Sequence, residues 1–194
     1  AIETGQTKSM LSEEIWKEGM KKNLTDRWDK MVDSLKQAID FMKKIGITNQ
    51  EEITSENLIL LITYMYSLKM PIDEENQLYK KLKYLVYSAM LWARYSGSSE
   101  SVVDKDLKLL KEIKGINALD EIIKDNERDE RKITPGIFKT HSKNSPEFKI
   151  YYLFMKDRLG EHEISKDVLY NLNKKEDHHI FPKKLLKKLG FEEN

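Results

Sequence analysis

The sequence predicts an all-α protein, folded as a multi-helix bundle. Apolar residues recur at spacings of three and four over several long stretches, which is the pattern of amphipathic helices. Most of these stretches begin and end at residues that typically start or stop helices. Few segments show the alternation of apolar and polar residues that is typical of strands. The composition, 39% hydrophobic and 35% charged, suits helices that bury one face and expose another. We therefore expect a mostly helical structure from about residue 12 to residue 159.

The first strong helix is predicted over residues 26–45, with Thr25 as its N-cap and Gly46 as its stop. A shorter apolar segment precedes it around residues 13–22, and this segment contains Ile15, Trp16 and Met20.

Two helices dense in apolar residues are predicted next. Ser55 is expected to cap the first and Pro71 to end it, and the second should cover residues 74–94. A helix that is apolar on most faces belongs in the middle of a bundle.

A loop marked by Gly97 among serines separates these helices from several shorter ones. The N-caps expected for the later elements are Ser101, Asn117, Thr134 and Ser145. The large side chains expected to be mostly buried are Trp28, Leu61, Leu85, Trp92 and Phe154.

The charge balance favours no particular class of partner. The chain has 34 Lys and Arg against 33 Asp and Glu, so any basic patch that binds nucleic acid must be local. It has no cysteine, which excludes disulfides, thiolate zinc sites and cysteine nucleophiles. No apolar run reaches membrane-spanning length. We expect a cytoplasmic protein that does not bind membranes.

The segment "EDHHIFPKKLLKKLG", residues 176–190, contains two adjacent histidines, His178 and His179. A neutral imidazole can bind a metal ion, and it can also act as a base near neutral pH. In a loop or at a strand edge the two could share metal-assisted phosphodiester hydrolysis, one as ligand and one as base. From the histidines alone, a surface pair without a role is the favoured interpretation.

A basic stripe is predicted directly after the histidines. On a helix, four lysines would lie side by side on one face while the leucines face the core. These lysines could contact phosphates without recognising sequence, and they are Lys183, Lys184, Lys187 and Lys188. The alternative is an ordinary solvated lysine face. His162, between Glu161 and Glu163, is better explained as a surface histidine than as a metal ligand.

The stretch "DHHIFPKKLLKKLG" resembles the opening of the HNH nuclease module. It is most similar to the "HHIFPK" form in the C-terminal nuclease of GmrSD-type restriction endonucleases. Upstream, "WARYSGSSESVVDKDL", residues 92–107, is similar to the segment that follows the long buried helices of that family. Such proteins combine an N-terminal ParB-like NTPase domain, a helical middle region and a C-terminal HNH module, and they act in phage defence on foreign, often modified, DNA.

The resemblance implies roles for single residues. His179 would be the general base, His178 a metal ligand, and Pro182 would shape the turn that leaves the strand. The implied cofactor is a divalent cation, Mg²⁺ or Mn²⁺, and the implied partner is DNA. A homo-oligomer stays open.

Two departures from the family pattern shape the expected domains. An HNH site needs a later asparagine and a final histidine, and no histidine follows His179. Asn194 could supply the asparagine, although we expect the asparagine of the motif farther downstream. The second departure is that no ParB-like domain is recognisable in the sequence. We therefore expect a helical connecting domain at residues 1–165 and a truncated start of a ββα-metal module at residues 166–194, inactive by itself. The alternative is a non-catalytic helical scaffold for protein interaction or DNA binding.

Overall fold

The structure is a computed structural model that describes residues 27–97, 99–127, 131, 133–138, 142 and 144–160, with side chains through Phe154. The chain forms two compact units, Ala1–Arg158 and Leu159–Asn194. The described residues lie almost entirely in the first unit. The predicted boundary between residues 165 and 166 lies outside them.

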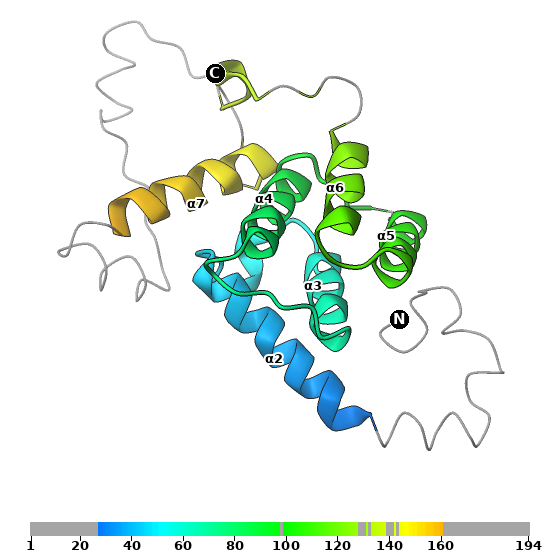
Figure 1. Cartoon of the computed structure of the whole chain (residues 1–194). Coiled ribbons are helices and arrows are strands. Elements are labelled where there is room, and N and C mark those ends of the chain that lie inside the picture. Colours follow the sequence, from blue (N-terminus) through cyan, green and yellow to red (C-terminus); the bar gives the residue numbers. More distant parts are fainter. Residues whose placement is uncertain are drawn as a thin grey trace, which may run out of the picture. The chain divides into compact units, whose positions relative to one another are not determined.

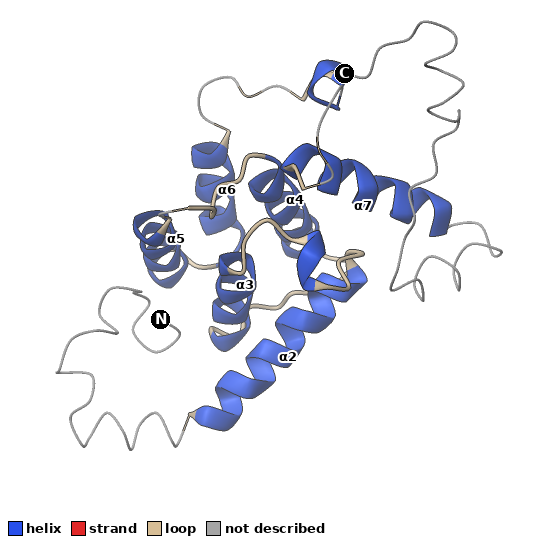
Figure 2. Cartoon of the chain, turned by 180° about the vertical axis from the view of Figure 1, so that it is seen from behind, coloured by secondary structure: helices blue, strands red, loops and turns tan. Residues whose placement is uncertain are grey.

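The described residues form helices and no strand (Figures 1 and 2). In chain order the elements are α2 (Trp28–Lys44), the 3₁₀ turn η3 (Gln50–Glu52), α3 (Asn57–Ser67), α4 (Gln77–Leu91), α5 (Glu100–Glu112), α6 (Gly115–Asn126), the 3₁₀ turn η4 (Pro135–Phe138) and α7 (Pro146–Gly160). The prediction of an all-α fold is confirmed for this part of the chain. The predicted ββα fragment lies outside it.

The helices pack in a sequence of neighbouring pairs. α2 packs against α3, α3 against α5, α5 against α6, and α6 against α4. The core draws its buried side chains mainly from α2 to α6, and Leu61 and Leu85 are fully buried in it, as predicted. In the part of the chain that the structure describes, no helix is both long and apolar enough to cross a bilayer.

Three helices end in the same left-handed turn, but only one of the turns uses glycine. After α2, the amides of Gly46 and Ile47 bind the carbonyls of Lys43 and Met42, which is the Schellman arrangement. Gly46, at φ 92°, therefore stops the helix as predicted. Lys69 after α3 and Ala93 after α4 take the same position at φ 56° and 50°.

The helix starts confirm some predicted caps. α7 begins at Pro146, and the Ser145 hydroxyl accepts a hydrogen bond from the Phe148 amide at 3.2 Å, as predicted. η4 begins at Pro135, directly after Thr134. Asn76, which was not predicted, caps α4 by accepting from the Tyr79 amide at 2.8 Å.

Other predicted caps are wrong. Ser101 and Asn117 lie inside α5 and α6, since those helices begin at Glu100 and Gly115. Ser55 does cap the start of α3, although it lies one residue before Glu56, because its hydroxyl accepts a hydrogen bond from the Asn57 amide at 3.3 Å. Thr25 and the segment 13–22 lie outside the described residues.

Burial differs from prediction at the two ends of the described chain. Trp28 is 59% exposed and Phe154 54% exposed, whereas Trp92 is half-buried. Trp28 is the first residue of α2, and that helix meets the core through residues farther along: Ser34, Ala38, Phe41 and Met42. On α7 the neighbouring Leu153 enters the core, so the side chain of Phe154 points elsewhere.

Candidate functional site

The site residues predicted from the sequence all lie outside the described residues. These are His178, His179, Lys183, Lys184, Lys187 and Lys188. The other two histidines, His141 and His162, lie outside them too. Within the described ranges, no group of three or more His, Asp or Glu side chains is placed to hold a metal ion. The predicted roles therefore stay predictions.

The other segment singled out by its family resemblance, residues 92–107, is described except for residue 98, and it contains a buried ionic network. The left-handed turn at Ala93 follows α4 and places Arg94 beside α5. Nε and Nη2 of Arg94 donate to the two carboxylate oxygens of Asp106 at 3.0 and 2.8 Å. The side chains of Arg94 and Asp106 are only 7% and 1% exposed.

A second carboxylate extends the network to α6. Nη2 of Arg94 also donates to Asp125 at 2.9 Å, and the ammonium of Lys105 lies 2.9 Å from the other oxygen of Asp125. Two cations thus face two carboxylates, so the charges balance.

The network shifts the pKa values of Arg94 and Asp125. Burial opposes the charge of Arg94, but the hydrogen bonds and charge of Asp106 outweigh it and raise the guanidinium pKa. Burial would raise the pKa of Asp125, yet hydrogen bonds from Lys105 and Arg94 lower it to about 2. Arg94 and Asp125 are therefore both charged across the physiological pH range.

Tyr95 connects the network to α3. Its hydroxyl donates to Asp106 at 2.7 Å, and burial followed by the charge of Asp106 raises the pKa of this phenol well above its ordinary value. Its carbonyl accepts hydrogen bonds from three side chains: Ser55 at 2.6 Å, Ser99 at 2.8 Å and Asn57 at 3.4 Å. The loop after α4 therefore joins α3, α4, α5 and α6.

The network suits positioning rather than chemistry. Each of its charges is paired. Removing one partner of a buried ion pair strongly destabilises the folded protein, because the other charge is left buried without a counter-ion. Its residues were not predicted as a cluster, although one signal was present. Asp106 falls on the apolar face of α5 together with Val103, Leu107 and Leu110, and an acid in that position indicates a buried cation.

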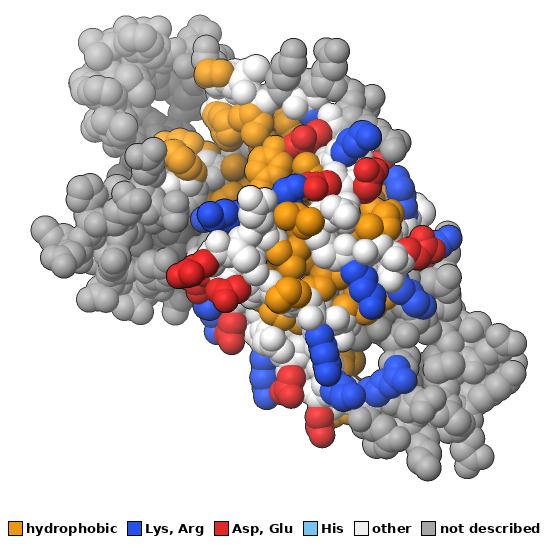
Figure 3. Space-filling model, in the orientation of Figure 1, with side chains coloured by type: hydrophobic (Ala, Val, Ile, Leu, Met, Phe, Trp, Pro, Cys, Tyr) orange, Lys and Arg blue, Asp and Glu red, His pale blue; other side chains and the backbone are white. Residues whose placement is uncertain are grey.

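The surface of the described helices carries both signs of charge. On the face shown in Figure 3, Lys and Arg side chains are interspersed with Asp and Glu, and hydrophobic side chains are exposed among them. Within the described residues, this face offers mixed charge rather than a continuous basic surface for DNA.

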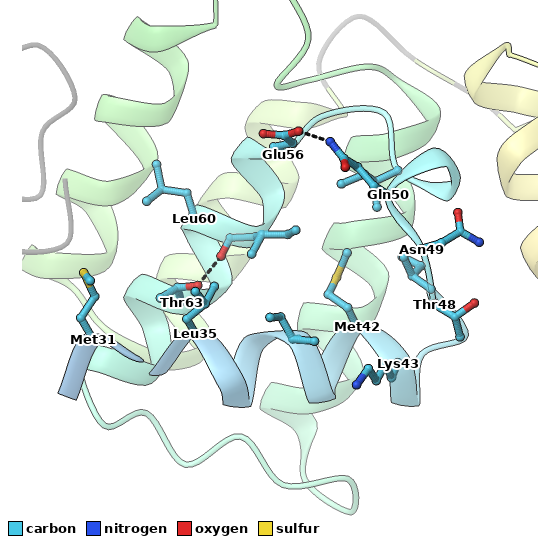
Figure 4. Close-up of a pocket in the computed structure, with 14 residues that line it drawn as sticks. Met31, Leu35, Met42, Lys43, Thr48, Asn49, Gln50, Glu56, Leu60 and Thr63 are labelled. Atoms are coloured by element: carbon cyan, nitrogen blue, oxygen red, sulfur yellow. Dashed lines mark hydrogen bonds between the residues drawn. The ribbon is translucent and has the colours of Figure 1, made fainter. Parts of the chain in front are cut away.

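An apolar groove of about 600 Å³ lies between α2 and α3. In Figure 4, Met31 and Leu35 rise from α2, and Leu60 and Thr63 come from α3. At one end the side chains of Gln50 and Glu56 are hydrogen-bonded to each other. The groove has few polar groups and no set of side chains arranged for catalysis.

Comparison with known proteins gives one distant relative and no family. No family model matches the chain, and no solved structure matches it. An uncharacterized protein of Methanocaldococcus jannaschii is 25% identical over 85% of this chain and 28% of its own length. The chain thus spans little more than a quarter of that relative.

Proposed function

We propose that this chain is part of a metal-dependent DNA endonuclease of the HNH type and that its helices form the connecting domain. The observation that carries the proposal is the sequence "DHHIFPK", residues 177–183, with its adjacent histidines, proline and following lysines. These residue types, in this order, supply a ligand, a base and cationic contacts for a phosphodiester.

The histidines would divide the work. His178 would hold a divalent cation, and the lone pair of a neutral imidazole fits that role. When bound, Mg²⁺ or Mn²⁺ would offset the negative charge that develops on the phosphate. His179 would accept a proton from the attacking water. Contacts to phosphates beside the reacting group would come from Lys183, Lys184, Lys187 and Lys188.

The helical body supports a connecting role. The Arg94 network ties α4, α5 and α6 together, and the carbonyl of Tyr95 adds α3. Such cross-links favour helices that move as one body, as a connector between a nuclease module and another domain requires.

A second candidate is a helical scaffold without chemistry of its own. The same paired charges and the mixed surface charge favour it, because both are features of a structural module. DNA cleavage distinguishes the two candidates, because only the first predicts that the natural protein cuts DNA and needs His179 to do so.

The test is cleavage of plasmid DNA by the protein expressed from the complete gene, with Mg²⁺ or Mn²⁺ present. We expect His179→Ala to reduce the single-turnover cleavage rate by about a hundred- to ten-thousandfold, because a general base acts in the transition state. DNA affinity and the circular dichroism spectrum should stay unchanged.

The matched control is His162→Ala, which removes a histidine outside the motif and should cleave like the wild type. Wild-type cleavage by His179→Ala would overturn the assignment of the base. A wild-type protein that cuts no DNA would favour the scaffold.

A further inference from the structure

Helix α2 has two apolar faces, and only one of them enters the core. The core face contains Ser34, Ala38, Phe41 and Met42. The second face contains Met31, Leu35 and Ile39, spaced four residues apart, and these line the groove described above. Leu35 and Ile39 are 38% and 39% exposed, and Trp28, on the same face one turn earlier, is 59% exposed. The described residues thus leave a continuous apolar stripe uncovered.

Helix α3 forms the wall of the groove opposite α2. The connection between the two helices closes one end of the groove. α3 contributes Ile59, Leu60 and Thr63, and the connection contributes Ile47 and Ile53. A hydrophobic groove between two helices is the surface that an amphipathic helix fills, through anchors at spacings of three and four residues.

We propose that residues 15–24 of this same chain dock in the groove as an amphipathic helix, antiparallel to α2. The segment ends directly before α2, because only residues 25–27 separate Leu24 from Trp28. Helices joined by so short a connection pack as antiparallel neighbours.

The apolar stripes of the two segments match in spacing and in length. Trp16, Met20 and Leu24 are four residues apart, like Met31, Leu35 and Ile39. In each set the first and last residues are eight positions apart, which is about 12 Å along a helix. In an antiparallel hairpin with this connection, Leu24 would lie against Trp28, Met20 against Met31, and Trp16 against Leu35.

The charges of the segment agree with this placement. Glu18 and Lys21 fall off the Trp16–Met20–Leu24 stripe and would face water, and Lys17 lies at its edge. Along that stretch of α2 the polar lining residue is Thr63, whose hydroxyl is bound to the Ile59 carbonyl, and the other polar members lie toward Gln50 and Glu56. Docking of this segment would not depend on the nuclease chemistry, because it involves only the helical body.

A double-mutant cycle in the full chain tests the contact between Trp16 and Leu35. The unfolding equilibrium constants of Trp16→Ala, Leu35→Ala and the double variant would be measured in urea. If the two side chains touch, the effect on the double variant should differ from the product of the single effects by about threefold or more. Trp16→Phe should retain most of the coupling, because the ring still fills the groove.

The matched control pairs Trp16→Ala with Ile113→Ala. Ile113 is 47% exposed at the end of α5 and does not line the groove, so these two effects should simply multiply. Coupling below about 1.5-fold for Trp16 with Leu35 would overturn the proposal. Stability that rises with protein concentration would also overturn it, because the groove would then be filled by a second copy.

Discussion

Arg94 joins three helices through contacts of a single side chain. It follows α4 and binds Asp106 on α5 and Asp125 on α6, and all three side chains are largely shielded from water. Removing one partner from such a cluster leaves a charge buried without its counter-ion. The network therefore makes helix packing depend on the ionisation of its members.

Asp125 should make the stability of the protein sensitive to acid. Its folded pKa of about 2 is below the ordinary value of 3.8, so its contribution is complete above about pH 4 and is lost as the pH falls toward 2. The side chain is 16% exposed, and with screening we expect a contribution of about 1–2 kcal/mol. Urea unfolding of Asp125→Asn between pH 5 and 2.5, as an approximate range, should show a shallower acid loss than the wild type.

At the upper end of that pH range the variant should also be less stable than the wild type, because Arg94 and Lys105 lose an ionised partner. Parallel stability curves for the two proteins over the whole acid range would show that the ion pairs of Asp125 add nothing to stability.

Ala93 occupies a backbone conformation that favours glycine. It sits at φ 50° in the turn that ends α4, where a Cβ atom is disfavoured. We expect Ala93→Gly to raise the free energy of unfolding by about 0.5–1 kcal/mol, measured in urea.

The reverse change at Gly46 is the control. Its φ is +92°, and no atom lies within 4 Å of an added Cβ, so Gly46→Ala should lose about 1 kcal/mol through backbone strain alone. Equal stability of both variants and the wild type would mean that these turns relax without cost.

Among the helices, α4 has its start fixed by one side chain. Asn76 accepts from the Tyr79 amide and also donates to the Pro71 carbonyl at 2.6 Å. Asn76→Ala should therefore lower the free energy of unfolding by about 1 kcal/mol, as measured by urea titration.

Asn117 is the matched comparison, because the sequence predicted it as a cap but it lies inside α6 with its side chain exposed. Asn117→Ala should be neutral or slightly stabilising, since alanine has the higher helix propensity. If both alanine variants lost the same stability, the cap at Asn76 would not be specific.

Helix existence could be predicted from the sequence, but which apolar face is covered could not. The periodicity of α2 identified Met31, Leu35 and Ile39 together with Ala38 and Met42, and only the fold shows that the first three line an open groove. Ser101 and Asn117 were mistaken for caps, two and three residues after the observed N-caps Ser99 and Lys114, because serine and asparagine also occur inside helices.

The buried network was predictable only in part, because its members are separated along the chain. Asp106 on an apolar face indicates a buried partner, but the identity of Arg94 and Asp125 depends on the turn at Ala93 and on the packing of α6. The motif residues His178 and His179 were identified by their sequence, and their arrangement stays a prediction.

At the scale of the whole molecule, the cross-linked helical body and the motif at residues 177–183 would have separate roles under the proposed function. The body has paired charges, an apolar groove and mixed surface charge, and these features suit a connector and a structural module equally. The chemistry is assigned to residues 177–183. The proposed function depends on the different roles of the two histidines, with His178 as metal ligand and His179 as general base.

Metal titration of the His178→Ala and His179→Ala variants of the full-length protein tests that claim most directly. Single-turnover cleavage would be measured over increasing Mn²⁺ and Mg²⁺. Loss of a ligand weakens metal binding, so excess metal should partly restore His178→Ala, whereas no metal concentration should restore His179→Ala. Rescue of His179→Ala alone would swap the two roles, and wild-type cleavage by both variants would contradict the nuclease assignment.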